Sequence, residues 1–149
     1  MLAQSFKTAE ELGLTTDQVE GLIKTLKVLE TDKTQHQPLR EFSGVFFFDT
    51  EQYRFDGLFN MAVWAGDQPE CGTIRCIGGT AEALMGKKLF DLVSIGRNEN
   101  QEELYDLFCP KARHLQGRPN WSEITPSQAA TALRSYLTTG QANWDAALA

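Results

Sequence analysis

Apolar residues recur every three or four positions in several stretches of the chain, which is the pattern of an amphipathic helix packed against a core. The first long stretch lies within residues 15–30, and its apolar positions are Val19, Leu22, Ile23, Leu26 and Leu29. Thr15 and Gln18 at its start have the residue types and the spacing of a capping box. The pattern therefore predicts a helix over residues 15–30, preceded by a shorter helix over residues 8–12 that stops at Gly13.

Similar signals predict two helices in the second half of the chain. The sequence Thr-Pro-Ser-Gln at residues 125–128 combines an N-cap, a proline at the first helical position and a capping-box partner. We expect this helix to end at Gly140. Asn100 and Glu103 form another capping-box pattern, which predicts a helix that stops before Pro110.

The stretch from Thr73 to Met85 also has helical spacing, and it is followed by Gly86, a residue type that commonly ends helices. Gly78 and Gly79 lie inside this stretch, and each costs a helix about 1 kcal/mol relative to alanine. Such a cost requires compensation by tertiary contacts. We therefore expect another part of the chain to approach closely at these two glycines.

Residue types that favour strands are found near the middle of the chain. Residues 45–48 and 53–55 are rich in aromatic side chains and flank the polar, turn-like residues 49–52, which favours a short β-hairpin. Residues 58–64 fit a short helix. Taken together, the patterns predict an all-α (mainly α) fold, a compact multi-helix domain over residues 1–149 with room for one short β-hairpin near residues 45–55.

The composition is that of a soluble globular protein and narrows the range of partners. The 149 residues are 42% hydrophobic and 23% charged, with a formal net charge of -6. This negative charge opposes sequence-independent binding to nucleic acid or to anionic lipid. No apolar run approaches the roughly 20 residues that a membrane helix needs, and the N-terminus shows no secretory signal. We therefore expect a cytoplasmic protein with no nucleic-acid partner, no membrane partner and no cofactor.

The first two predicted helices also match the outline of a helix-turn-helix, a common DNA-binding motif. The second of them would be the recognition helix, yet it begins with Asp17 and Glu20 and has only Lys24 and Lys27 as cations. Recognition helices carry basic and polar side chains near their N-terminus. A plain helical hairpin is therefore the favoured interpretation.

Four residues have the chemistry for sulfur or metal sites. Cys71 and Cys76 form a C-x4-C pattern, Cys109 and His114 form a C-x4-H pattern, and together they could make a structural Cys3His zinc site. Alternatively, Cys76 lies at the start of a predicted helix, where a thiolate is favoured, and Cys71 could form a reversible disulfide with it. The favoured interpretation is small buried cysteines and an exposed loop histidine, because the two pairs are far apart in the sequence and no C-x-x-C motif exists.

Three segments are distinctive as motifs: FNMAVW at residues 59–64, CGTIRCIGGTA at residues 71–81 and LFCP at residues 107–110. They resemble a group of uncharacterised bacterial and phage proteins that carry F-[DN]-M-x-x-W, C-G-T-x-x-C-I-[AG]-G and a later leucine-phenylalanine-x-proline. The resemblance includes residues 125–129 and spans most of the chain from about residue 8. It implies no assigned activity, so no catalytic residues can be carried over from that group. In that group the position of Cys109 is often not cysteine, which argues against a zinc site.

These observations favour a non-catalytic interaction or accessory protein, and the resemblance places it in a mobile-element setting. Its expected partner is another protein or a second copy of the same chain. The alternative is a thiol-redox or zinc-binding protein centred on Cys71 and Cys76. An enzyme that uses carboxylates in a cleft also stays open, because a sequence does not show which side chains converge.

Overall fold

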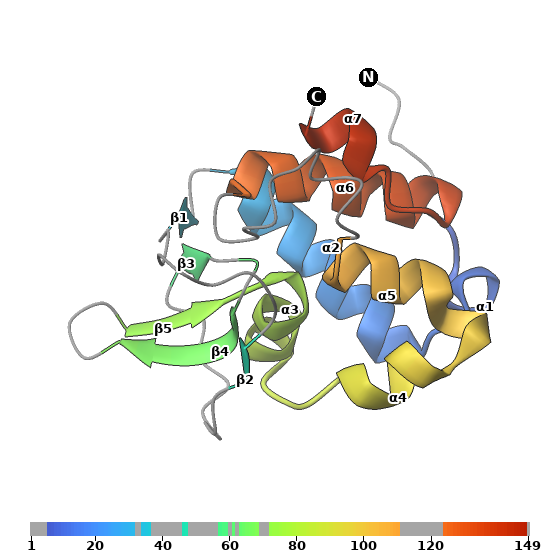
Figure 1. The fold of residues 1–149 in the computed structure, drawn as a ribbon, viewed down its shortest axis with the longest axis horizontal. Coiled ribbons are helices and arrows are strands. Elements are labelled where there is room, and N and C mark those ends of the chain that lie inside the picture. The colour runs from blue at the N-terminus through green and yellow to red at the C-terminus, as the bar shows by residue number, and fades with distance from the viewer. Residues whose placement is uncertain are drawn as a thin grey trace.

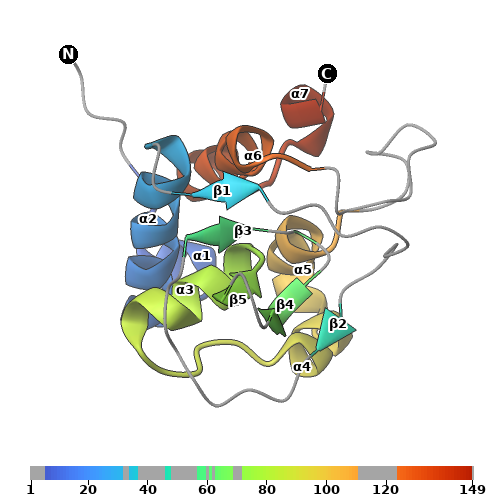
Figure 2. The ribbon, with the colours of Figure 1, turned by 90° about the vertical axis from the view of Figure 1, so that its left-hand side faces the viewer.

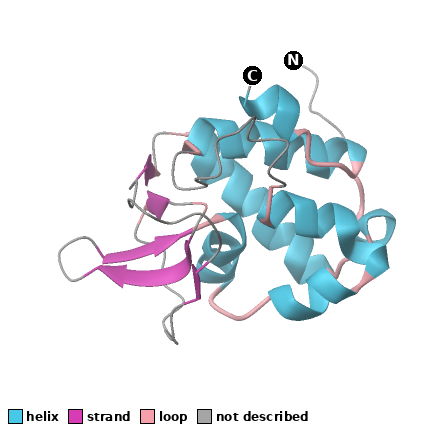
Figure 3. Ribbon diagram, viewed as in Figure 1, coloured by secondary structure: helices cyan, strands magenta, loops and turns pink. Residues whose placement is uncertain are grey.

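Helices predominate in the structure, a computed structural model that describes residues 6–31, 34–36, 46–47, 57–59, 61, 63–68, 72–110 and 124–148. The helices are α1 (Ala9–Leu12), α2 (Thr16–Glu30), α3 (Ile77–Met85), α4 (Leu92–Arg97), α5 (Glu102–Phe108), α6 (Pro126–Thr139) and α7 (Trp144–Leu148). The strands lie together at one side of the molecule, and the helices make up the rest (Figures 1 and 3). The mainly helical character predicted from the sequence is confirmed.

The capping boxes predicted at the starts of α2 and α6 are present. In α2 the backbone N–H of Gln18 donates to Thr15 Oγ1 at 3.1 Å, and the backbone N–H of Thr15 donates to Gln18 Oε1 at 2.9 Å. Thr125 and Gln128 form the same reciprocal pair at the start of α6, at 2.9 and 3.2 Å. These bonds satisfy backbone donors that the first turn of a helix leaves unpaired, which is why both helices begin where the sequence indicated.

The predicted capping box at Asn100 and Glu103 is wrong by a few residues. The cap is Asn98, whose side-chain oxygen accepts a hydrogen bond from the backbone N–H of Asn100 at 2.9 Å. A turn of 3₁₀ helix, η1 (Glu99–Gln101), follows this cap and leads into α5. Such turns often precede α-helices, and they shift the boundary that a capping pattern indicates.

Five short strands form a sheet in the order β1-β3-β5-β4-β2. They are β1 (Gln35–His36), β2 (Phe46–Phe47), β3 (Leu58–Phe59), β4 (Val63–Gln68) and β5 (Gly72–Arg75). Neighbouring strands are parallel except β4 and β5, which are antiparallel. With the sheet side turned to the viewer, β4 and β5 lie between α3 and α5 (Figure 2).

Two helix predictions near the sheet are wrong. The helix expected from Thr73 begins at Ile77, because Gly72–Arg75 pairs with β4 as a strand. Residues 58–64, predicted as a short helix, lie in β3 and at the start of β4 where the structure describes them. Short apolar runs do not distinguish a strand from a helix by their periodicity, and here strand pairing decides.

The predicted hairpin near residues 45–55 is not shown. Phe46–Phe47 does form a strand, but it pairs in parallel with β4. Its expected partner, residues 53–55, lies outside the described residues. Aromatic residues therefore indicated a strand at this position, and a distant segment of the chain determined its pairing.

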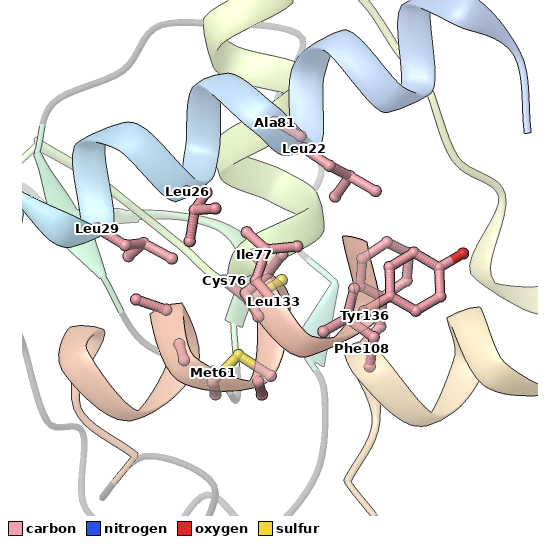
Figure 4. Packing of buried hydrophobic residues seen from close by; sticks show 14 of the residues in the cluster. Leu22, Leu26, Leu29, Met61, Cys76, Ile77, Ala81, Phe108, Leu133 and Tyr136 are labelled. Carbon is pink, nitrogen blue, oxygen red and sulfur yellow. The ribbon is translucent and has the colours of Figure 1, made fainter. Parts of the chain in front are cut away.

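The hydrophobic core lies between α2, α3, α5 and α6. Leu22, Leu26 and Leu29 of α2 face Ile77 of α3 and Leu133 of α6 across this space (Figure 4). All five side chains are buried, at 5% exposure or less. Burial of this kind contributes about 1.5–3 kcal/mol for each large apolar side chain, so the apolar stripe of α2 is a main source of its stability.

Gly21 of α2 packs closely against α3 and the segment that follows it. A Cβ atom added there would lie 2.8 Å from Leu89 Cδ1, 3.1 Å from Met85 Cγ and 3.3 Å from the Ala81 Cβ. The sequence predicted a close approach at two glycines of α3, both of which are buried. The structure shows a close approach at a glycine of the opposite helix, and the approach expected at Gly78 and Gly79 stays a prediction. No helix in the described part of the chain is long and apolar enough to cross a membrane.

We expect Gly21→Leu to lower the free energy of unfolding by about 1–3 kcal/mol, because a larger side chain must displace the residues packed over this position. Lys27→Leu is the matched control: it places the same side chain at an exposed position of the same helix. It should stay within about 0.5 kcal/mol of the parent. Urea unfolding followed by circular dichroism measures both, and equal stability of the two variants would contradict close packing at Gly21.

Candidate functional site

The structure brings two of the four predicted sulfur or metal ligands together. Cys76 lies at the N-cap of α3 and Cys109 directly follows α5; both are free thiols in the core, with exposures of 1% and 7%. They are close enough for Cys76 to affect the pKa of Cys109. Cys71 and His114 lie outside the described residues. The pairing of Cys71 with Cys76 therefore stays a prediction.

Both buried thiols are held in the protonated form. Burial raises the pKa of Cys76 from its usual 9.0 to about 12, although the backbone N–H groups of Gly79 and Gly78 oppose this change. Burial, and then the neighbouring Cys76, raises the pKa of Cys109 to about 12 as well. Since the thiolate is the reactive form of cysteine, neither sulfur is activated as a nucleophile. The neutral thiols favour folding fully below pH 9.0, and this contribution is lost as the pH rises towards about 12.

A zinc site is not assembled by the residues that the structure describes, since these contain no group of three or more potential metal ligands. Two of the four proposed ligands, Cys76 and Cys109, are near each other in the core, which a shared site requires. The other two lie outside the described residues. The Cys3His zinc site is therefore neither confirmed nor contradicted and stays a prediction.

The buried carboxylate of Glu82, in α3, accepts hydrogen bonds from the backbone. Its side chain is 3% exposed, and Oε2 accepts hydrogen bonds from the backbone N–H groups of Leu89 at 2.8 Å and Phe90 at 3.1 Å. On the other side of the same segment, Gln18 Nε2 donates to the carbonyl oxygen of Leu89 at 2.7 Å. These bonds hold the connection between α3 and α4 in place, a structural use that sequence patterns did not indicate.

A different feature has the properties of a binding site: an open hollow of about 470 Å³ between α1, α5 and the C-terminal end of α6. These three elements lie at one end of the molecule (Figure 1). The lining residues of this α1/α5/α6 hollow are Lys7, Glu10, Glu11, Leu12, Gly13, Asn100, Gln101, Glu103, Leu104, Tyr136, Thr139, Gly140 and Gln141. Its volume is within the range of sites for small molecules or for single side chains of a partner.

Tyr136 is one of the residues that line the hollow. The residue is 2% exposed, its ring packs in the core, and its hydroxyl points away from the packed cluster (Figure 4). Within the described part of the chain, no group forms a hydrogen bond with this hydroxyl. Burial and then the charge of Glu103 raise the pKa of Tyr136, so its hydroxyl stays protonated. It can therefore donate and accept hydrogen bonds with a molecule in the hollow.

The hollow offers hydrogen bonds and charge but no activated nucleophile. Its described lining contains no cysteine, serine or histidine, and the hydroxyl of Thr139 is already bonded to the carbonyl oxygen of Ser135 at 2.7 Å. No pattern in the sequence indicated this site. Its residues come from three distant parts of the chain, and none of them belongs to a recognisable motif.

Comparison of the chain with protein-family models, with curated proteins and with solved structures finds no match in any of the three.

We expect Cys76 and Cys109 to be protected from thiol reagents in the folded protein. In a Cys71→Ser variant, which leaves only these two thiols, reaction with a disulfide reagent near neutral pH should be slow and should accelerate when urea unfolds the chain. Adding Lys27→Cys to this variant provides the control, because that position is exposed and its thiol should react at once. Equally fast reaction of all three thiols in the native state would contradict the buried, protonated arrangement.

Proposed function

We propose that the protein is a non-catalytic interaction protein that binds its partner at the α1/α5/α6 hollow. The observation that carries this proposal is the hydroxyl of Tyr136, which opens into the hollow without a hydrogen bond from the described residues. The hollow is open to solvent and this hydroxyl is not fully enclosed, so water can bond to it when no ligand is present. A ligand that bonds to the hydroxyl takes the place of that water.

The character of the hollow supports binding over catalysis. Catalytic sites contain a nucleophile, or an acid and a base whose pKa values suit proton transfer near neutral pH. Tyr136 has a pKa raised further from neutrality, and the two core thiols are protonated and enclosed. The resemblance to uncharacterised bacterial and phage proteins carries no assigned activity. A small accessory protein of the cytoplasm is consistent with these features.

The partner that we propose is another protein or a second copy of this chain. The hollow is open to solvent and is bordered by helix ends, so it suits a side chain that protrudes from another surface. The alternative, a thiol-redox or zinc-binding protein centred on Cys71 and Cys76, finds less support. Cys76 is enclosed in the core and its pKa is raised to about 12, whereas redox-active cysteines are exposed and have lowered pKa values.

We expect Tyr136→Phe to leave the free energy of unfolding within about 0.5 kcal/mol of the parent, because the ring stays packed and no internal hydrogen bond is lost. Thr25→Val is the matched control, since it also removes a buried hydroxyl, but one that donates to the carbonyl oxygen of Gly21 at 2.8 Å. This control should cost about 1 kcal/mol. A larger loss for Tyr136→Phe in urea unfolding would show that the hydroxyl has a structural role.

The same variant tests the binding site. Random peptides displayed on phage are selected on the parent protein, and their contacts are mapped by the amide shifts of the ¹⁵N-labelled chain. Selected peptides should shift residues of the hollow, and they should bind less tightly to Tyr136→Phe and to Asn100→Trp, which fills the hollow from its exposed rim. Peptides that shift other surfaces, or that bind all three proteins equally, would contradict the proposal.

A further inference from the structure

The charges around the hollow are mostly negative. Its lining contains three carboxylates, those of Glu10, Glu11 and Glu103, and one ammonium group, that of Lys7. The Glu11 carboxylate accepts a hydrogen bond from the backbone N–H of Thr8 at 2.9 Å, and this bond lowers its pKa and keeps it ionised. At neutral pH the side chains alone therefore create a negative potential at the hollow.

Two helix ends add to this potential. The C-caps of α1 and α6, Gly13 and Gly140, both line the hollow. The C-terminal end of a helix carries a partial negative charge and carbonyl oxygens that face outward. Neither helix has a basic residue in its own last turn, although the Lys7 side chain lies beside Gly140 and offsets part of the charge at the end of α6. The backbone N–H of Lys7 bonds to one carbonyl oxygen of α6, that of Leu137, at 2.7 Å.

We infer that the α1/α5/α6 hollow binds the guanidinium group of an arginine side chain on a partner protein. This inference rests on the proposed function. The acceptors in the hollow are the carboxylate of Glu103, the hydroxyl oxygen of Tyr136 and the amide oxygen of Asn100, whereas the amide oxygen of Gln101 already accepts a hydrogen bond from Asn98 Nδ2 at 3.3 Å. They are spread around one space, and a guanidinium group has five N–H donors in a planar fork. An ammonium group has fewer donors and is more strongly hydrated.

Other occupants fit less well. An anionic group would meet three carboxylates and two helix C-termini, which oppose it electrostatically. A metal ion needs several ligands at short range, and the described residues do not form such a group. An apolar side chain would leave the Tyr136 hydroxyl without a hydrogen bond.

The test uses two short glycine peptides that differ at their central residue. One has arginine there, and the other has citrulline, which has nearly the same shape but no charge. Binding to the full ¹⁵N-labelled chain is followed by amide shifts at low salt. The arginine peptide should shift residues of the hollow and bind about tenfold more tightly than the citrulline peptide. Added salt should reduce this difference, because the charges of the hollow are exposed to solvent.

Variants identify the site. Glu103→Gln and Tyr136→Phe should each weaken binding of the arginine peptide severalfold. Glu102→Gln is the matched control: it removes a charge at the adjacent residue, which does not line the hollow, and it should leave the affinity unchanged. An equal effect of Glu102→Gln and Glu103→Gln would overturn the inference, because the peptide would then respond to overall charge alone.

The outcomes separate this inference from the proposed function. If the citrulline peptide binds at the hollow as tightly as the arginine peptide, the inference is overturned and the proposed function is supported. If neither peptide shifts residues of the hollow, the inference is overturned, and the phage selection then decides the proposed function independently. Tighter binding of the arginine peptide that is weakened by Glu103→Gln and not by Glu102→Gln supports both.

Discussion

The close contact between α2 and α3 at Gly21 is the constraint on which the rest of the core depends. It allows Ala81, Met85 and Leu89 to pack directly over the backbone of α2. The backbone of Leu89 is then held by two hydrogen bonds: its carbonyl oxygen accepts from Gln18 Nε2, and its N–H donates to the Glu82 carboxylate. An ion pair between Lys87 and Asp17 joins the same two regions, but it is about half exposed and contributes little. Because α2 also packs against α6, its position relative to α3 determines where the third helix lies.

That packing gives buried polar groups different environments. Cys76 begins α3 and is enclosed by the core, so its thiol is kept neutral and unreactive. Tyr136 is buried to a similar degree on α6, but its hydroxyl lies where the end of α6 meets α1 and α5. One group is therefore part of the interior, whereas the other opens to a space that a ligand can enter. Burial alone would not separate a structural residue from a binding residue; the direction in which the polar atom points does.

The candidate site could not be predicted because its members have no local signature. Tyr136 lies beside Leu133 and Leu137 in an apolar helical pattern, where an aromatic residue is expected to be part of the core. Glu10 and Glu103 are typical surface carboxylates of predicted helices. Only the approach of α1 and α5 to the end of α6 places these residues around one hollow. The cysteines differ from these residues, because their spacing in the sequence suggested a functional site. In the structure, the two cysteines that are described are enclosed in the core.

The sequence by itself determined the features that depend on neighbouring residues: the capping boxes of α2 and α6, the glycine C-caps at Gly13, Gly86 and Gly140, and the apolar stripe of α2. These depend on hydrogen bonds and side-chain spacing within one or two helical turns. Tertiary structure decided that residues 72–75 form a strand, that the close helix contact lies at Gly21, and that the hollow exists. The physical reason is that strand pairing, helix crossing and a shared cavity depend on groups far apart in the chain, whose positions no local pattern specifies.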